Sequence, residues 1–467
     1  MNESFESNAA PGTQACEVRS CECAAASRTD TDDGHPLIRR VLMFALFSGG
    51  LMTLSFLGII PGIPTFVWLA CSAGAGVLAA LFYRRTVVLK TAVVLLSCCS
   101  ILAFADGLWR VCAPTSLYYR PDEMLLNHWP RMGSLARYSA GATYCSRSYG
   151  DLAAMAGRPE FREYRTIMFR SDSFGFPNAS VSPEPVDVIL LGDSFGAGSA
   201  ISQAKTWGSL LGSRYHAAVY NLSIPDSGPW HELMDLKIEL GRIKRREGAV
   251  VLWAIFSGND LDDAFEDHME PVLSESWLAQ MRVSVASFRN RSPIRQLCQR
   301  AFAALQGERR PPIVRYLPDG RCILFRRGYA ERARRTLADI QTHDNYPRLV
   351  QVFREMAQFA VCERLNVGVA ALPSKEEVYG WVLSGTPYSD RDAQPSAFSG
   401  VVRQLCETYQ MRFLDLKPPM VAEARRLLTE EGKLLWWSDD THWNERGHAF
   451  AAATVYAGLL RPMLLVR

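Results

Sequence analysis

The sequence predicts an α/β protein: a flavodoxin-like, doubly wound parallel sheet of five strands, preceded by about three transmembrane helices. Strands and helices alternate from Val186 onward, which is typical of a parallel sheet covered by helices. Glycine-rich and polar blocks follow the predicted strands, where such sheets bind ligands. Three long apolar runs precede residue 106. At 467 residues the chain is too long for one ordinary domain.

The N-terminal part divides into a tail and a membrane region. Residues 1–37 are rich in Ala, Ser, Thr and Asp, and we expect a disordered cytoplasmic tail. Within 38–106, the runs 41–60 and 61–83 carry no charge, and 86–105 carries one. Each run is long enough to span a bilayer as a helix.

Basic residues predict the orientation of these spans. Arg39 and Arg40 precede the first run, and Arg84 and Arg85 lie between the second and third. Because basic residues favour the cytoplasmic side, we expect a cytoplasmic N-terminus and an extracytoplasmic, periplasmic-type location after about residue 106. Lys90 must reach the interface for the third run to span. If that run does not span, the large domain is cytoplasmic instead.

The remainder is predicted to hold an entry segment, 107–185, and a catalytic domain, 186–467. Candidate strands are 186–192, 216–224, 248–256, 366–373 and 411–416. Candidate helices lie near 199–213, 229–246, 347–364, 397–409, 420–431 and 444–460. Because the third and fourth strands are too far apart for a simple crossover, we expect an insertion at about 261–345.

The insertion is strongly basic in an otherwise balanced chain. Residues 271–345 contain fourteen arginines, no lysine and six acidic residues, whereas the whole chain has a net charge of +3. An arginine-rich surface suits an anionic glycan or lipid headgroups, and a solvated face without a partner remains the alternative. We expect no nucleic-acid partner.

Six of the twelve cysteines fall after residue 106, and sequence alone leaves their state open. Outside the cytoplasm they are able to form disulfides, and buried free thiols are the alternative. The six are Cys112, Cys145, Cys298, Cys322, Cys362 and Cys406.

The chemistry is predicted from a serine and a histidine at opposite ends of the domain. Ser194 lies in Gly192-Asp193-Ser194, directly after an apolar strand, and is the candidate nucleophile. A serine hydroxyl needs a base within hydrogen-bond reach, and His442 is the best candidate. An Asp three residues earlier can receive the other imidazole N–H, so we favour Asp439, with Asp440 as the nearby alternative.

Two further blocks predict donors for an oxyanion. Asn259 follows the third strand, and its amide is able to stabilise the developing charge together with the backbone N–H of Ser194. The loop after the second strand offers a backbone N–H, from Gly228 in our preferred alignment or from Asp226 in an ungapped one. A carboxylate at that place disfavours an oxyanion unless it points away.

These four blocks resemble the SGNH hydrolases, also called the GDSL family. The resemblance covers about residues 165–465 apart from the insertion, and it implies the SGNH fold and an ester hydrolase mechanism. Carried over, it implies a triad of Ser194, His442 and Asp439, and an oxyanion hole of Ser194, a glycine N–H and Asn259. The stretches 172–176, 205–207 and 442–444 also resemble membrane-anchored members.

Other interpretations fit less well. An α/β-hydrolase elbow matches residues 192–196 but leaves Asn259 unexplained. Phosphate-loop and dinucleotide-binding patterns fail on their glycine spacing. The acidic run 260–268 lacks the glycine turn of a calcium loop, so we expect neither metal nor cofactor.

The sequence therefore predicts a serine acyl- or acetylesterase acting outside the cytoplasm on an O-acylated cell-surface glycan or lipid. Two alternatives remain open. In one, the protein is a polysaccharide O-acetyltransferase that works with a membrane acyltransferase partner. In the other, it is a catalytically inactive glycan-binding module.

Overall fold

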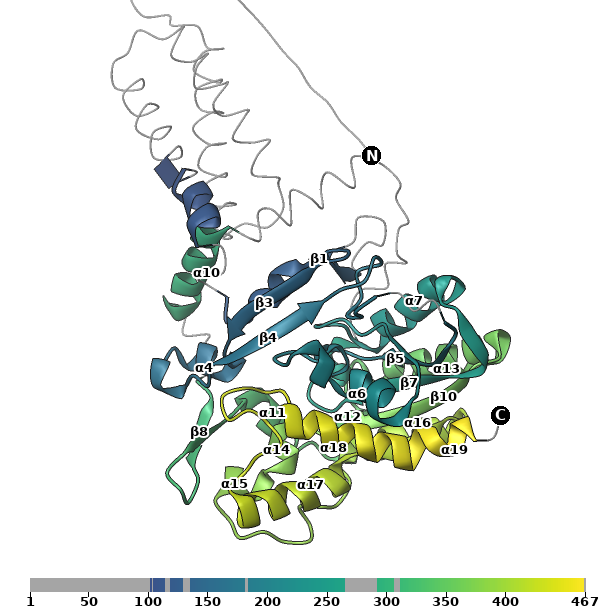
Figure 1. The fold of residues 1–467 in the computed structure, drawn as a ribbon. Helices are drawn as coiled ribbons and strands as arrows, with labels where there is room; N and C mark the ends of the chain where they lie inside the picture. The colour runs from purple at the N-terminus through teal and green to yellow at the C-terminus, as the bar shows by residue number, and fades with distance from the viewer. Residues whose placement is uncertain are drawn as a thin grey trace, which may run out of the picture.

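The computed structural model describes residues 101–102, 104–113, 118–128, 135–180, 184–264, 292–305 and 311–465. Within them, a central sheet is covered by helices on both faces, and smaller antiparallel strand pairs lie beside it (Figure 1).

The central sheet has five parallel strands in the order β11-β10-β7-β5-β6. Their bounds are Val186–Leu191 (β5), Val219–Asn221 (β6), Arg245–Phe256 (β7), Asn366–Leu372 (β10) and Arg412–Asp415 (β11). All five predicted strands are present, and the chain crosses from β6 past β5 to β7. This order is the flavodoxin-like one that the alternation predicted.

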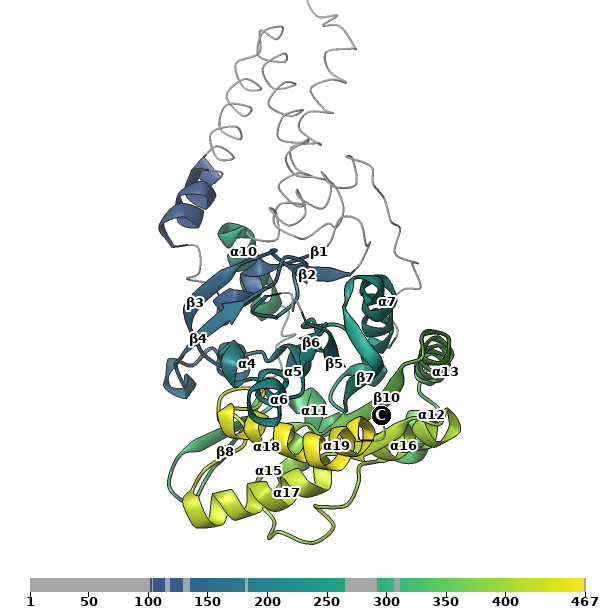
Figure 2. The same cartoon turned by 45° about the vertical axis from the view of Figure 1, so that its right-hand side comes forward.

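Alternating side chains along β7 divide the core into two layers. Val250, Leu252 and Ala254 face one layer, and Val251 and Trp253 face the other. The first layer is covered by α6 (Trp207–Tyr215), α17 (Lys417–Arg426), α18 (Glu445–Val455), η6 (Tyr456–Leu460) and α19 (Arg461–Leu464). The second is covered by α7 (Pro229–Glu239), α13 (Tyr346–Glu363) and α16 (Ala397–Thr408). Helices cover both faces of the sheet, as is typical of parallel strands (Figure 2).

The predicted entry segment contains regular secondary structure. Most of its described part consists of residues 118–128 and 135–180, which are called here the N-terminal β segment. It contains two antiparallel pairs, β1 (Leu126–His128) with β2 (Ala136–Tyr138) and β3 (Thr143–Ser148) with β4 (Arg165–Arg170). Its short helices are η1 (Pro121–Leu125), α4 (Asp151–Ala156) and η2 (Pro159–Phe161).

The insertion contributes a second small unit next to the sheet. It contains α8 (Asp260–Asp263), α10 (Pro293–Leu305), the antiparallel pair β8 (Ile313–Tyr316) and β9 (Cys322–Phe325), α11 (Arg327–Arg332) and α12 (Leu337–Gln341). The remaining short helices are α5 (Ser194–Ala197), η3 (Gln203–Lys205), η4 (Leu240–Arg242), α14 (Lys375–Val378), α15 (Gly380–Ser384) and η5 (Leu427–Glu431).

The predicted tail and the runs 41–60 and 61–83 lie outside the described residues, as does most of 86–105. Among the residues that are described, the structure contains no helix with the length and apolar character needed to cross a membrane. The six cysteines after residue 106 are free thiols.

Candidate active site

Ser194 begins the short helix α5, directly after β5 and the turn at Gly192 and Asp193. Asp193 caps this helix by accepting a hydrogen bond from Phe195 N at 2.8 Å. The cap fixes the turn and leaves Ser194 partly exposed at the carboxyl edge of the sheet. This is the position that the sequence predicted for the nucleophile.

His442 lies against Ser194 from the other end of the domain. Its Nε2 is 2.7 Å from Ser194 Oγ, and its ring packs on Phe195 with centroids 4.9 Å apart. Asn444 caps the following helix α18 by accepting from Arg446 N and Gly447 N, which fixes where the loop ends. Ser194 and His442 are therefore brought together as predicted.

The carboxylate beside His442 belongs to Asp440 and not to Asp439, which corrects our expectation. Asp440 Oδ1 is 2.9 Å from His442 Nδ1. The side chain of Asp439 faces away and accepts hydrogen bonds from Gly150 N at 2.6 Å and Glu163 N at 2.9 Å. The physical reason is the tight turn of this loop, in which the residue two places before His442 is the one that faces the ring.

The charges around this pair keep it in the form that a base requires. Burial alone raises the pKa of Asp440, but Arg120 and Arg165 outweigh it and hold the pKa well below its usual range. Burial lowers the pKa of His442, and the charge of Arg120 lowers it further. A neutral imidazole beside an ionised carboxylate is the resting state of a general base.

Sequence reasoning missed four residues that hold this loop. Arg120 and Arg165 contact Asp440, and Asp151 accepts from Thr441 N at 2.9 Å. Lys375 is fully buried and donates to the carbonyls of Asp440 and Trp437, both at 2.8 Å, and to that of Ser438 at 3.1 Å. Burial lowers the pKa of Lys375 to about 8. No motif marks these residues, because all four come from elements distant in sequence.

Asn259 follows β7 as predicted, and its amide already donates a hydrogen bond within the protein. Asn259 Nδ2 donates to Asp263 Oδ2, and its Oδ1 is buried with no hydrogen-bond partner among the described residues. Burial raises the pKa of Asp263, and the bond from Asn259 opposes that rise. An Asn amide has two N–H groups, so one is left for an oxyanion.

The loop that follows β6 places Gly228 and Asp226 near Asp263. A Cβ added to Gly228 would lie 2.8 Å from Asp263 O, so only glycine fits against α8 here. Asp226 is exposed and has a left-handed backbone with φ +62°. The charges of Asp263 and Asp226 also act on Asp193. Gly228 therefore lies next to Asp263, the residue that binds Asn259, and the carboxylate of Asp226 lies nearby.

Buried carboxyl groups lie behind the nucleophile. Burial raises the pKa of Asp193 to about 7, and the nearby Asp263 and Asp226 contribute. Burial also raises the pKa values of Glu232 and Asp260 well above their usual range, and each is affected by neighbouring carboxyl groups. Glu232 accepts from Trp253 Nε1 at 2.6 Å, and Asp260 accepts from Phe256 N at 2.7 Å. Burial therefore favours the protonated form of each of these three groups.

One cluster in the described part of the chain has the composition of a metal site. Ligand atoms of Asp151, Asp440 and His442 lie within 4.8 Å of one another. Arg120 Nη2 lies among them, 2.8 Å from His442 Nδ1 and 3.8 Å from Asp151 Oδ2. A guanidinium therefore has the place that a cation would take. In the acidic run after Asn259, Asp262 is likewise paired, with Arg332 at 2.7 Å and Arg335 at 3.1 Å.

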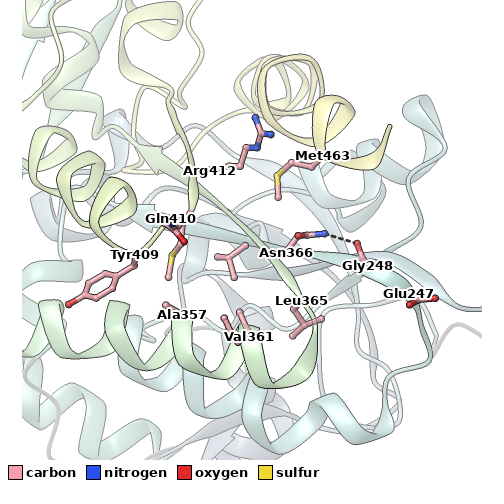
Figure 3. A pocket seen from close by; sticks show the side chains of 13 residues that line it. Glu247, Gly248, Ala357, Val361, Leu365, Asn366, Tyr409, Gln410, Arg412 and Met463 are labelled. Atoms are coloured by element: carbon pink, nitrogen blue, oxygen red, sulfur yellow. Dashed lines mark hydrogen bonds between the residues drawn. The ribbon is translucent and has the colours of Figure 1, made fainter. Parts of the chain in front are cut away.

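A separate pocket lies at the opposite end of the strands from Ser194, next to the amino ends of β7, β10 and β11. It has a volume of about 710 Å³ and a floor that includes Val361, Leu365 and Met463. Figure 3 shows Asn366 and Gly248 at its rim, joined by a hydrogen bond of 3.3 Å. Ser194 and Asn259 follow the carboxyl ends of their strands, so this pocket is not part of the site.

Comparison with known proteins gives likenesses among solved structures only. No family model and no curated protein matches the chain. Similar structures include TesA, with 14% identity over 59% of this chain and 98% of that chain and a TM-score of 0.30. A lipolytic G-D-S-L family member from Veillonella parvula has 10% identity over 59% and 98%, with a TM-score of 0.32. An acetyl xylan esterase, AlAXEase, has 10% identity over 58% and 98%, with a TM-score of 0.31. The function is argued below from the geometry of the site.

Proposed function

We propose that this protein is a serine ester hydrolase that acts through an acyl-enzyme on Ser194. The observation that carries the proposal is the chain of contacts from Ser194 Oγ to His442 Nε2 at 2.7 Å and from His442 Nδ1 to Asp440 Oδ1 at 2.9 Å. A nucleophile, a base and a carboxylate in this order are the parts of a serine hydrolase triad.

The mechanism follows from these contacts. His442 Nε2 takes the proton as Ser194 Oγ attacks the ester carbonyl, and Asp440 stabilises the imidazolium that forms. The oxyanion accepts from Ser194 N–H, from Asn259 and from the loop at Gly228. The imidazolium then gives its proton to the leaving alcohol. Water, deprotonated by His442, releases the acid and restores the serine.

The proposed substrate is an O-acylated cell-surface glycan or lipid, and the proposed location of the site is outside the cytoplasm. The apolar runs before residue 106 support an anchored chain. In the helical residues 101–112, Ile101, Phe104, Leu108 and Val111 are exposed, with 66%, 73%, 53% and 81% of their surfaces accessible. Their spacing of three and four places them on one helix face, which suits contact with lipid or with the preceding spans.

The catalytic proposal is tested with the full-length protein in detergent. Hydrolysis of p-nitrophenyl acetate is measured for the wild type, Ser194→Ala and a matched control, Ser209→Ala, whose hydroxyl lies on α6. We expect turnover to be lost in the first variant and retained in the second. Equal turnover by the wild type and Ser194→Ala would reject the serine mechanism.

The same assay separates hydrolysis from acyl transfer. An added oligosaccharide acceptor is followed by mass spectrometry for the gain of one acetyl group. Acetate release without acceptor supports hydrolysis, and acetate release only with acceptor supports the transferase. A folded wild type that forms no acyl-enzyme favours a glycan-binding role.

The location is tested by cysteine labelling, because the chain carries suitable thiols. Cys362 is exposed in the domain, and Cys16 lies in the predicted tail. Variants keeping only one of them are treated with a membrane-impermeant maleimide in intact spheroplasts. We expect Cys362 to react and Cys16 to react only after lysis. Protection of Cys362 until lysis would place the site in the cytoplasm.

A further inference from the structure

The loop that carries Asp440 is held by a part of the chain that the sequence did not connect with catalysis. Residues of the N-terminal β segment bind both sides of Asp440. Thr441 donates to Asp151 through N and Oγ1, at 2.9 and 2.5 Å, and Glu163 Oε2 accepts from Ser438 N at 3.1 Å. The shape of this loop therefore depends on residues nearly three hundred positions earlier.

The contact between the two parts is tight at one glycine. Gly150 N donates to Asp439 Oδ2 at 2.6 Å, and a Cβ added to Gly150 would lie 1.9 Å from Asp439 O. The backbone of the N-terminal β segment thus lies directly on the loop, with no room for a side chain.

Two arginines from this segment bind the two oxygens of Asp440. Arg165 Nη2 contacts Asp440 Oδ2, while its Nη1 is 2.9 Å from Asp439 Oδ1 and its guanidinium lies 4.5 Å from the centre of the Trp437 ring. Arg120 Nη2 contacts Asp440 Oδ1, the oxygen that also faces His442. Both arginines are almost fully buried.

Arg120 has the additional property of touching the base itself. Its Nη2 is 2.8 Å from His442 Nδ1. A guanidinium has donors only, so it cannot accept the Nδ1 proton, and two adjacent N–H groups repel. Asp440 Oδ1 is the acceptor that both require. We propose that Arg120 is a positioning residue of the triad, which holds Asp440 Oδ1 against His442 and disfavours a charged imidazole at rest.

This inference rests on the proposed esterase function and adds a pH dependence to it. The titratable and charged groups that face His442 or its carboxylate are Arg120, Asp122 from η1, Asp151 from α4, Arg165 from β4, Lys375 from α14, Asp439 from the same loop and His448 from α18. After burial, Arg120 is the strongest influence lowering the pKa of His442, while Asp440 and Asp151 oppose it.

The sign of the effect on activity follows. Catalysis needs the neutral imidazole, so the rate rises with pH through the pKa of His442. Removing Arg120 raises that pKa and moves the acid limb of the pH profile to higher pH. Arg165 acts on Asp440 and is not among the main influences on His442, so its removal should lower the rate with a smaller movement of that limb.

The experiment measures kcat and KM against pH for the full-length wild type, Arg120→Met, Arg165→Met and a control, Arg147→Met. Arg147 is in the same β segment, exposed and stacked on Tyr164 at 3.9 Å. For Arg120→Met we expect kcat to fall roughly 10- to 100-fold at little changed KM, the scale known for outer partners of metal-binding histidines, which are likewise held by a hydrogen bond to one ring nitrogen. The acid limb should move upward. The control should match the wild type.

The outcomes separate this inference from the function on which it depends. Labelling of Ser194 by a fluorophosphonate is followed in parallel, with Ser194→Ala as the blank. Wild-type labelling no faster than the blank rejects the proposed function. If the wild type is active and Arg120→Met has the same kcat and the same pH profile, the inference is rejected and the proposed function stands. If the methionine variant does not fold, the Arg120→Lys variant tests the inference in its place. It keeps the charge but lacks the planar fork, so a lowered kcat with a retained acid limb is the supporting result. An unchanged kcat in Arg120→Lys overturns the inference.

Discussion

The two halves of the site are built differently. In the acid–histidine half, Asp440 and His442 are buried, and Asp440 is bound by Arg120, Arg165 and Lys375 from three other segments of the chain. In the oxyanion half, which comprises Asp226, Gly228, Asn259 and Asp263, Asn259 is partly exposed and bound to a carboxyl group, and Asp226 is exposed.

The difference shows which part of the catalysis is preorganised. The proposed proton-transfer pair, Asp440 and His442, is held in place by contacts within the protein, whereas the proposed oxyanion donors lie among carboxyl groups. Stabilisation of the oxyanion by aimed donors is usually a large contribution to such reactions. We therefore expect changes in the first half only to lower activity, whereas changes in the second half lower or raise it according to the residue.

The largest expected effect distinguishes two neighbouring carboxylates. Asp440→Asn should lower kcat about 10⁴-fold, because an amide cannot stabilise the imidazolium and favours the wrong tautomer. Asp439→Asn is the matched control. It should cause a much smaller decrease, since Asp439 contacts the N-terminal β segment and not the ring. Steady-state kinetics on folded protein check both, and equal losses would contradict the assignment of Asp440.

The next effect concerns the oxyanion donor. Asn259→Ala should lower kcat by roughly 10²- to 10³-fold with little change in KM, as loss of one such donor does elsewhere. Asp263→Asn serves as its companion, because it removes the charge and keeps an acceptor for the Asn259 amide. We expect that variant to keep or exceed wild-type activity. A loss as large as that of Asn259→Ala would show that the carboxylate itself is needed.

A smaller change in the opposite direction is expected at Asp226. Asparagine tolerates the left-handed backbone of this residue, so Asp226→Asn alters charge without strain. It should increase kcat/KM roughly two- to tenfold at low ionic strength, because a repelling charge near the oxyanion is removed. Added salt should narrow the difference between variant and wild type. A salt-independent decrease would mean that Asp226 contributes to binding.

The smallest effect on activity, and a clear one on stability, is expected from Glu232→Gln. Burial raises the pKa of Glu232 well above its ordinary value of 4.5, so the folded state keeps a proton that the unfolded state releases. Stability is therefore lost as pH rises from that ordinary value toward the raised pKa of the folded state. The amide removes this dependence while retaining an oxygen for Trp253. Thermal unfolding should show a higher Tm than wild type at pH 8 and a smaller difference at pH 5. A lower Tm at pH 8 would contradict the neutral acid.

Much of the fold could be predicted because its strands are continuous apolar runs. Residues 186–191 and 249–256 are buried along their whole length, so their pattern was clear. The N-terminal β segment was harder, because β3 alternates between exposed and half-buried residues and is paired through an antiparallel partner seventeen or more positions away. The aromatic residues in that stretch do not recur at the spacing of a helix or of a strand.

For the site, local motifs predicted Ser194, His442 and Asn259, which each follow a strand or precede a helix. The choice between Asp439 and Asp440 depends on how one loop turns, and the turn is determined by Gly150, Asp151 and Lys375. Those contacts are not encoded near the motif. The general rule is that spacing predicts which residues are candidates, whereas partners from distant elements decide which of them faces the ring.

The separation between Arg120 and Asp440 also has a consequence in time. They are 320 positions apart in a chain that is synthesised from the N-terminus. At about 5–20 residues per second, Arg120 leaves the ribosome roughly 16 to 64 seconds before its partner exists. Until then the buried arginines lack their counter-ions, and the nucleophile lacks its base. On the proposed mechanism, the nascent chain is therefore unable to cleave esters until His442 has been made.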